Sequence, residues 1–304
     1  MPKIAFLFPG QGSQHAGMGS EVLEDREVSE LADRCSAASG IDLRRLLTEA
    51  DDDELRLTTN AQPALLFMGV ALATLLQRRG VHPDAAAGHS VGEYTALCVA
   101  GALAPEQAVK TVAERGRAMA EAAPPGTSSM SAVLGLNGKL VETALLGVPD
   151  VWPANYNTPT QIVLGGTMLG LERAGARLKE AGARRVLPLN VAAAFHTPLM
   201  EPACGVLRGT LDATAWRTPQ VPVVANVSAQ PYRDADLIPA ALERQLSSPV
   251  RWEAGVRRLA ELGCDRFVEV GPKRVLSGMM SELLPDAITY SVSTPEAARA
   301  LQLT

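Results

Sequence analysis

Residues 86–94 read AAGHSVGEY, and this stretch decides how the rest of the chain is understood. Ser90 lies between Gly88 and Gly92, after a short apolar run and before a stretch of helical character. The spacing fits G-x-S-x-G, a tight turn from a strand into a helix where larger residues at the glycine positions would clash. A helix N-terminus there would favour a developing oxyanion. The same letters also fit a glycine-rich turn without chemistry, so a nucleophile needs support from elsewhere in the chain.

Apolar runs on both sides of this turn predict an α/β fold. We expect strands at 3–8, just before Ser90, at 221–227 and at 266–271. We expect helices at 62–80, 91–103, 104–123 and 271–284. Strands that alternate with helices favour a mainly parallel sheet, so the large subdomain is predicted to be α/β-hydrolase-like.

A second, smaller unit is predicted after a linker-like break at 124–129. Strand-like runs at 130–136, 161–166 and 183–191 alternate with helical patterns at 140–147 and 169–182. This β-α-β-α-β order predicts an inserted ferredoxin-like subdomain. We therefore expect a large subdomain at 1–127 and 197–304, and a small one at 128–196.

Composition excludes several classes of protein. The 304 residues carry a net charge of −5, which argues against a nucleic-acid partner. The four cysteines and four histidines lack metal-ligand spacing, so we expect no metal or other cofactor and free thiols in a reducing compartment. The start, MPKIAFLFPG, predicts a first strand and not a signal peptide. We expect a cytoplasmic monomer with no membrane span.

A nucleophilic serine needs a base. Four histidines are candidates: His15, His82, His89 and His196. His89 is adjacent to the serine and points in a poor direction on the turn. His196, in AAAFHTPLM, follows a predicted strand, and active sites of α/β sheets gather at strand ends. Asp150 is the one aspartate between Ser90 and His196, which favours a Ser–His dyad with the imidazole oriented by a carbonyl or an amide.

A glycine-rich loop, FPGQGSQ at 8–14, follows the first predicted strand. It lacks the lysine of a P-loop and the spacing of a dinucleotide fingerprint. Such a loop is able to aim a backbone N–H and a glutamine at a reacting carbonyl, or it is a simple turn.

Six motifs in order resemble the malonyl-CoA:acyl carrier protein transacylase family, which includes the acyltransferases of fatty acid and polyketide synthesis. They are FPGQGSQ (8–14), GHSVGEY (88–94), ERGRAM (114–119), AAFHTPLM (193–200), QLSSPVRW (245–252) and VEVGPKRVL (268–276). Together they extend over nearly the whole chain.

The resemblance implies a role for each matching residue. Ser90 would be acylated, His196 would be the general base and acid, and the N–H groups of Gln11 and Val91 would form the oxyanion hole. Arg115 would hold the free carboxylate of malonyl, since a guanidinium pairs with a carboxylate through two hydrogen bonds. Gln245 would orient His196 through a carbonyl or contact the acyl group. The remaining substrate-binding residues implied are His89, Met119, Met130 and Phe195, and Phe195 should crowd an α-methyl branch.

The partners implied are malonyl-CoA and an acyl carrier protein with a phosphopantetheine arm. Because carrier proteins are typically acidic, we expect them to dock on basic residues. The candidates are Arg184, Arg185, Lys273 and Arg274. Three alternatives stay open: a transferase for a larger or unusual acyl unit, an acyl-carrier-protein acyl hydrolase of the same fold, and a scaffold without activity.

Overall fold

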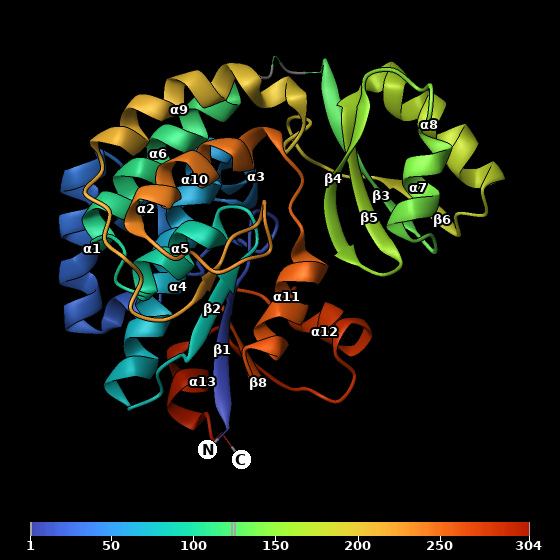
Figure 1. Ribbon diagram of the computed structural model, residues 1–304. Helices are drawn as coiled ribbons and strands as arrows, with labels where there is room; N and C mark the ends of the chain where they lie inside the picture. Colours follow the sequence, from blue (N-terminus) through green and yellow to red (C-terminus); the bar gives the residue numbers. More distant parts are fainter. Residues whose placement is uncertain (1, 123, 125, 304) are drawn as a thin grey trace.

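The computed structural model describes residues 2–122, 124 and 126–303 (Figure 1). The last residue of the predicted helix 104–123, one residue of the predicted break 124–129 and both chain ends lie outside the described residues. The described residues form a large unit and a smaller one that stands beside it.

The large unit is built on a parallel sheet of five strands in the order β7-β2-β1-β8-β9. The strands are β1 (Lys3–Phe8), β2 (Ala85–Gly88), β7 (Val223–Val224), β8 (Cys264–Val270) and β9 (Ile288–Val292). The predicted fold class, with a mainly parallel sheet, is thus confirmed. The strand predicted at 221–227 is shorter, with two residues in the ladder.

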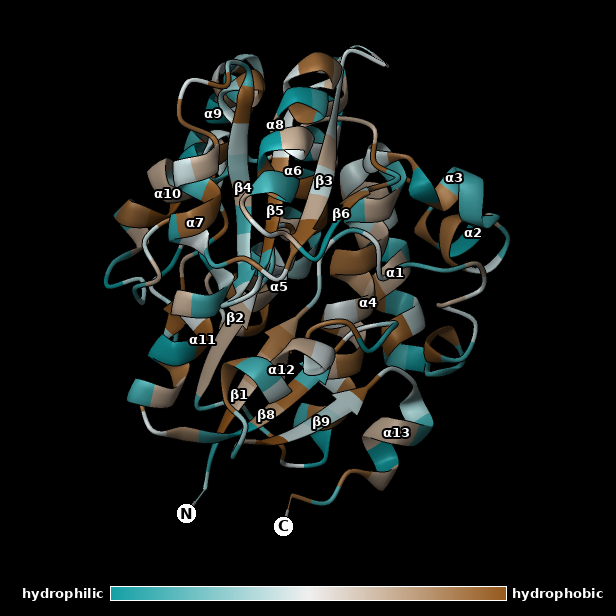
Figure 2. Ribbon diagram, turned by 90° about the vertical axis from the view of Figure 1, so that its right-hand side faces the viewer, coloured by the Kyte–Doolittle hydropathy of each residue, from teal (hydrophilic) through white to brown (hydrophobic). Residues whose placement is uncertain are grey.

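Both faces of this sheet are covered. Phe6 and Phe8 pack into one core, and Ala5 and Leu7 pack into another, because successive side chains of a strand point to opposite faces. Figure 2 shows the hydrophobic character of these central strands. The first core lies under α1 (Arg26–Ser39), α2 (Leu43–Thr48), α3 (Asp52–Arg56), α4 (Thr58–Arg78), α5 (Gly92–Val99), α6 (Pro105–Glu121), α9 (Glu201–Ala213), α10 (Ile238–Ser247) and α13 (Pro295–Ala300). The second lies under α11 (Trp252–Glu261) and α12 (Ser277–Leu283).

Several helix boundaries differ from the sequence prediction. α12 begins at Ser277, six residues after the predicted start, because the loop before it donates its N–H groups to the Glu269 carboxylate. α4 begins at Thr58, four residues before the predicted start, and is long and apolar enough to cross a membrane by length and composition. However, 78% of its apolar window is buried inside the protein, as in a core helix. α5 ends at Val99, earlier than predicted, because Gly101 takes a left-handed φ of 79° that breaks the helix.

The small unit has the order β3-α7-β4-β5-α8-β6. Its elements are β3 (Ser128–Leu134), α7 (Gly138–Ala144), β4 (Val151–Thr158), β5 (Gln161–Thr167), α8 (Met168–Glu180) and β6 (Arg185–Pro188). The sheet is antiparallel in the order β4-β5-β3-β6, a ferredoxin-like arrangement.

The predicted β-α-β-α-β order was incomplete, because it missed β4. This strand contains Pro153, which normally argues against a strand. β4 lies at the edge of its sheet, where a residue without an N–H is tolerated. The missed strand matters for function, because it places Asn155 and Asn157 in the lining of the cavity described below.

The free edge of β4 joins the two units. The N–H of Tyr156 donates to the carbonyl of Val250 (2.9 Å), and the N–H of Val250 donates to the carbonyl of Ala154 (2.9 Å). Nearby, the Thr160 hydroxyl donates to the Glu282 carboxylate on α12 (2.7 Å). These contacts fix the small sheet over the carboxyl ends of β1 and β2, where the candidate site lies.

Candidate active site

The turn that carries Ser90 connects β2 to α5 and leaves no room for side chains on either flank. A Cβ on Gly88 would lie 1.8 Å from the carbonyl carbon of Gly92, and a Cβ on Gly92 would lie 2.2 Å from the carbonyl oxygen of Phe8. Ser90 itself has φ of 55°, a left-handed value that is uncommon for a residue with a side chain. Such strain is typical of functional turns. The turn pushes the Ser90 hydroxyl out of the chain path and into a cavity.

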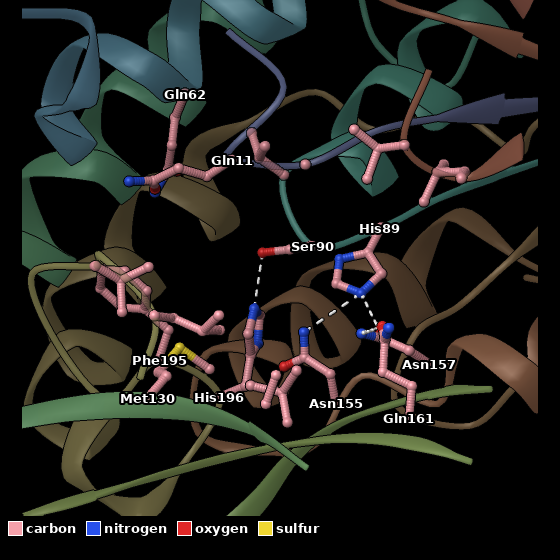
Figure 3. Close-up of a pocket in the computed structure, with 18 of the residues that line it drawn as sticks. Gln11, Gln62, His89, Ser90, Met130, Asn155, Asn157, Gln161, Phe195 and His196 are labelled. Carbon is pink, nitrogen blue, oxygen red and sulfur yellow. Dashed lines mark hydrogen bonds between the residues drawn. The ribbon is translucent and has the colours of Figure 1, made fainter. Parts of the chain in front are cut away.

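Ser90 and His196 lie within hydrogen-bonding distance, and they point toward each other in Figure 3. The Ser90 Oγ to His196 Nε2 distance is 2.7 Å, and His196 Nδ1 lies 2.7 Å from the backbone carbonyl oxygen of Gln245. A carbonyl only accepts, so Nδ1 carries the proton and Nε2 presents a lone pair to the serine. Burial, followed by the charge of Arg115, lowers the pKa of His196 to about 3. The imidazole is therefore a neutral base at neutral pH.

Arg115, on α6, is fully buried and reaches the same cavity. Its guanidinium donates to the Gln62 side-chain oxygen (2.6 Å), the Gln245 side-chain oxygen (2.9 Å) and the Ser90 hydroxyl (3.2 Å). It also lies over the ring of Tyr94, 5.5 Å from the centroid. Burial lowers its pKa, yet arginine stays protonated in proteins. A buried cation beside a serine–histidine pair suits an anionic group on the substrate.

A network of buried side chains lies beneath the turn. Asn226 accepts from the Ser90 N–H (2.8 Å) and donates to the Gly88 carbonyl (2.7 Å). The Gln245 amide nitrogen donates to the Ser90 carbonyl (3.0 Å) and to the Glu93 carboxylate (2.5 Å). Backbone groups on both sides of the serine are thus hydrogen-bonded, which fixes the strained turn.

The cavity has a volume of about 360 Å³ and lies between the two units. Of the predicted residues, Gln11, His89, Ser90, Val91, Arg115, Met119, Met130, Phe195 and His196 line it. Gln245 does not line the cavity; its side-chain oxygen accepts from Arg115 and its backbone carbonyl oxygen lies against His196, and it acts on the cavity through these two residues. Among the described residues, the N–H groups of Gln11 and Val91 have no hydrogen-bond acceptor, which leaves them free for an oxyanion.

His89 points away from the serine, toward the small unit (Figure 3). Its Nε2 lies 3.0 Å from Asn157 Oδ1 and 3.3 Å from Asn155 Nδ2, and its ring packs on Trp252. Burial lowers the pKa of His89, so this ring is neutral too. It serves to link β4 with the turn that carries the nucleophile.

Sequence reasoning missed several polar residues of the cavity wall: Gln62, Asn155, Asn157 and Gln161. Gln62 lies in an apolar helix, and a glutamine just before its run of leucines and alanines was the available signal. Asn155 and Asn157 alternate along β4 and share one face of it. That signal could not be used because the strand itself was missed.

The predicted docking residues are exposed and fall in two places. Arg184 and Arg185 lie at the start of β6 on the small unit. Lys273 and Arg274 lie in the loop between β8 and α12, and the Lys273 ammonium donates to the Gln14 carbonyl (2.9 Å). Lys273 also lines a second hollow that shares Gln11 with the catalytic cavity.

Comparisons with known proteins agree with this geometry. A family model described as "Acyl transferase domain" matches residues 5–295. The chain belongs to the acyl transferase domain family. This acyl transferase is 43% identical over 301 residues to the malonyl CoA-acyl carrier protein transacylase of Bacillus subtilis (strain 168), with 97% of this chain and 95% of the relative covered.

Solved structures are similar over the whole acyl transferase. An acyl carrier protein S-malonyltransferase from Vibrio cholerae has a TM-score of 0.95 and 38% identity, with 99% of this chain and all of that chain covered. A malonyl-transacylase in complex with its type II polyketide synthase acyl-carrier protein has a TM-score of 0.94 and 37% identity, with 98% of each chain covered. The family inferred from the six sequence motifs is therefore confirmed.

Proposed function

We propose that this chain is a malonyl-CoA:acyl carrier protein transacylase, which moves malonyl from CoA to Ser90 and then to the phosphopantetheine thiol of an acyl carrier protein. One observation carries the choice of acyl group: a fully buried Arg115 faces the cavity within reach of the Ser90 hydroxyl. A free carboxylate on the acyl unit would pair with this cation. The relatives named above, and the complex with a carrier protein, support the same assignment.

In the first half-reaction, His196 Nε2 takes the proton of Ser90 as Oγ attacks the thioester carbonyl carbon. The carbonyl oxygen becomes an oxyanion between the N–H groups of Gln11 and Val91, at the start of α5. When the intermediate collapses, the C–S bond breaks and His196 returns the proton to the sulfur of CoA. Ser90 is left as a malonyl ester.

In the second half-reaction, the thiol of the carrier's phosphopantetheine arm gives its proton to His196 and attacks the ester carbonyl. The C–O bond to Ser90 breaks, and His196 returns the proton to the serine. Both steps exchange an ester and a thioester, so the proposal requires no redox cofactor and no metal. Arg115 would position the malonyl carbonyl for attack by Ser90 in the first step and by the carrier's thiol in the second.

The test is the intact mass of the protein after brief incubation with malonyl-CoA. We expect a malonyl-sized adduct on the wild-type chain and none on Ser90→Ala. Addition of a carrier protein that bears its phosphopantetheine arm should then remove the adduct and malonylate the carrier. Loss of the adduct to water alone would identify a hydrolase, and an adduct with a bulkier acyl donor only would favour the unusual-acyl alternative.

For the carrier protein, we propose docking on the four exposed cations named above. The double substitution Arg184→Glu and Arg185→Glu should raise the KM for carrier protein, because it would place negative charge against an acidic partner. Acylation of Ser90 by malonyl-CoA should be unchanged. An unchanged KM for the carrier would exclude Arg184 and Arg185 as docking residues, and Lys273 and Arg274 would be tested next. That the protein acts as a monomer in the cytoplasm stays a prediction.

A further inference from the structure

Arg115 is buried without a carboxylate partner in the empty cavity. Its three hydrogen-bond acceptors are neutral side chains, and no carboxylate of the described residues lies within salt-bridge distance of it. A buried unpaired charge is strongly destabilising, because it loses its hydration without compensation. The fold therefore needs a negative charge that acts on Arg115 from farther away.

Glu93 is a buried carboxylate that likewise lacks an oppositely charged partner in direct contact. It is 1% exposed and, among the described residues, has no lysine or arginine within salt-bridge distance. Its carboxylate accepts hydrogen bonds from the Tyr232 hydroxyl (2.5 Å), the Gln245 side-chain amide (2.5 Å) and the Asn226 backbone N–H (3.2 Å). All three neighbours are able to donate, and Glu93 lies in the first turn of α5, where the helix dipole favours an anion. Burial raises the pKa of Glu93 to about 7, and these donors oppose that rise.

One side chain connects the two buried charges. The oxygen of the Gln245 amide accepts from Arg115, and a guanidinium has no acceptor, so the orientation of this amide is fixed. Its nitrogen must then face Glu93, to which it donates. The order carboxylate, amide, guanidinium aligns the amide dipole with both charges, which strengthens both hydrogen bonds.

We propose that Glu93 is the buried counter-ion of Arg115, acting through the Gln245 amide, and that it sets how strongly the cavity attracts a substrate carboxylate. Glu93 is a positioning residue, since it does not touch the cavity. Above about pH 7, where it is ionised, it balances the charge of Arg115 in the empty protein. When a carboxylate binds Arg115, as the proposed function requires, Glu93 competes with it electrostatically. Removal of the negative charge should thus lower stability and tighten carboxylate binding.

The substitution Glu93→Gln isolates this charge. Its oxygen can still accept from Gln245 and Asn226, and the Tyr232 hydroxyl can turn to accept from the new amide. Urea unfolding of the wild type, Glu93→Gln, Arg115→Met and the double variant gives the coupling between the two charges. We expect Glu93→Gln to reduce the folding equilibrium constant about tenfold in the presence of Arg115, and less than about threefold in Arg115→Met. Equal losses in both backgrounds would overturn the proposal.

Kinetics supply a readout that a merely structural role would not move. In Glu93→Gln we expect the KM for malonyl-CoA to fall roughly three- to tenfold, with the KM for acetyl-CoA unchanged within about twofold. Glu114→Gln is the matched control: it removes a carboxylate on the outer side of α6, where Glu114 pairs with the exposed Arg117, and should leave both KM values unchanged. A raised KM for malonyl-CoA in Glu93→Gln, or equal changes for both substrates, would contradict the counter-ion role.

The two proposals fail in distinguishable ways. The unfolding cycle uses no substrate, so it tests the pairing of Glu93 with Arg115 whatever the acyl group is. The malonyl adduct on wild-type Ser90 tests the proposed function without any change at Glu93. If the unfolding cycle shows coupling between Glu93 and Arg115 but Ser90 carries no malonyl adduct, the counter-ion proposal stands and the proposed substrate is wrong.

Discussion

Replacement of Arg115 by alanine is expected to lower kcat/KM for malonyl-CoA by roughly 10²–10⁴-fold, because a buried cation that pairs with a carboxylate contributes about 3–5 kcal/mol. Acetyl-CoA has no carboxylate, and its kcat/KM should change by less than about tenfold. The preference for malonyl over acetyl would then largely disappear. Initial rates of Ser90 acylation with the two donors measure it.

Arg117 offers a matched control two residues along the same helix. Its side chain is exposed and pairs with Glu114, so Arg117→Ala should leave both rates unchanged. If Arg115→Ala lowers the rates with malonyl-CoA and acetyl-CoA equally, Arg115 serves the fold or the Ser90 hydroxyl and not the acyl carboxylate. The hydrolase alternative would then regain support, since a hydrolase of uncharged acyl chains has no use for a cation that binds a carboxylate.

The sequence predicts those parts of the site whose residues lie close together in the chain. Gly88, Ser90 and Gly92 are close in the chain, and the turn they form is dictated by clashes that a Cβ would make within a few residues or with the adjacent strand β1. His196 could be selected because it follows a predicted strand and precedes Thr-Pro. Local pattern and tertiary structure agree at the turn. The strand predicted at 183–191 is shorter, however: β6 ends at Pro188, eight residues before His196, in the small antiparallel sheet, so no strand end positions this imidazole.

Arg115 shows the limit of local reasoning. On an amphipathic helix a single arginine is ordinarily a solvated charge, and only the family resemblance singled it out. Its burial results from close packing of α6 on α4, where a Cβ on Gly116 would lie 3.0 Å from the Thr58 carbonyl oxygen. The sequence of α6 alone does not indicate how closely α4 packs against it. It also does not indicate that Gln62 on α4 accepts a hydrogen bond from Arg115.

The buried network was out of reach for a related reason. From the motif GHSVGEY alone, Glu93 resembles an exposed acidic residue in the first turn of a helix. Its partners Tyr232 and Asn226 lie more than 130 residues away along the chain. Similarly, β4 was missed because Pro153 and its asparagines contradict the usual strand composition. Polar residues that serve a site break the local rules on which sequence reasoning depends.

Replacement of His196 by alanine is expected to slow acylation of Ser90 by malonyl-CoA about 10²–10⁴-fold, the usual contribution of a general base. The Ser90 hydroxyl would lose its acceptor at 2.7 Å and keep only the donor Arg115. Malonyl-CoA binding should persist, because the cavity and Arg115 are unaltered, so KM should change much less than kcat. A single-turnover rate equal to that of the wild type would exclude His196 as the base.

The pH dependence gives a second test of the same residue. A base acts above its pKa, and the pKa of His196 in the free protein is lowered to about 3, first by burial and then by the Arg115 charge. We therefore expect kcat/KM with acetyl-CoA to be flat from about pH 5 to pH 8, whereas an ordinary histidine would halve the rate near pH 6.5. With malonyl-CoA, ionisation of Glu93 near pH 7 should lower kcat/KM as the pH rises, which is opposite in sign to the titration of a base. A malonyl carboxylate on Arg115 offsets the charge that depresses this pKa. The pKa seen in kcat should therefore lie above the one seen in kcat/KM, and the bound substrate would itself strengthen the base. Acetyl-CoA brings no carboxylate to Arg115, so the pKa values seen in kcat and in kcat/KM should coincide for this donor. A separation of equal size for both donors would contradict this coupling.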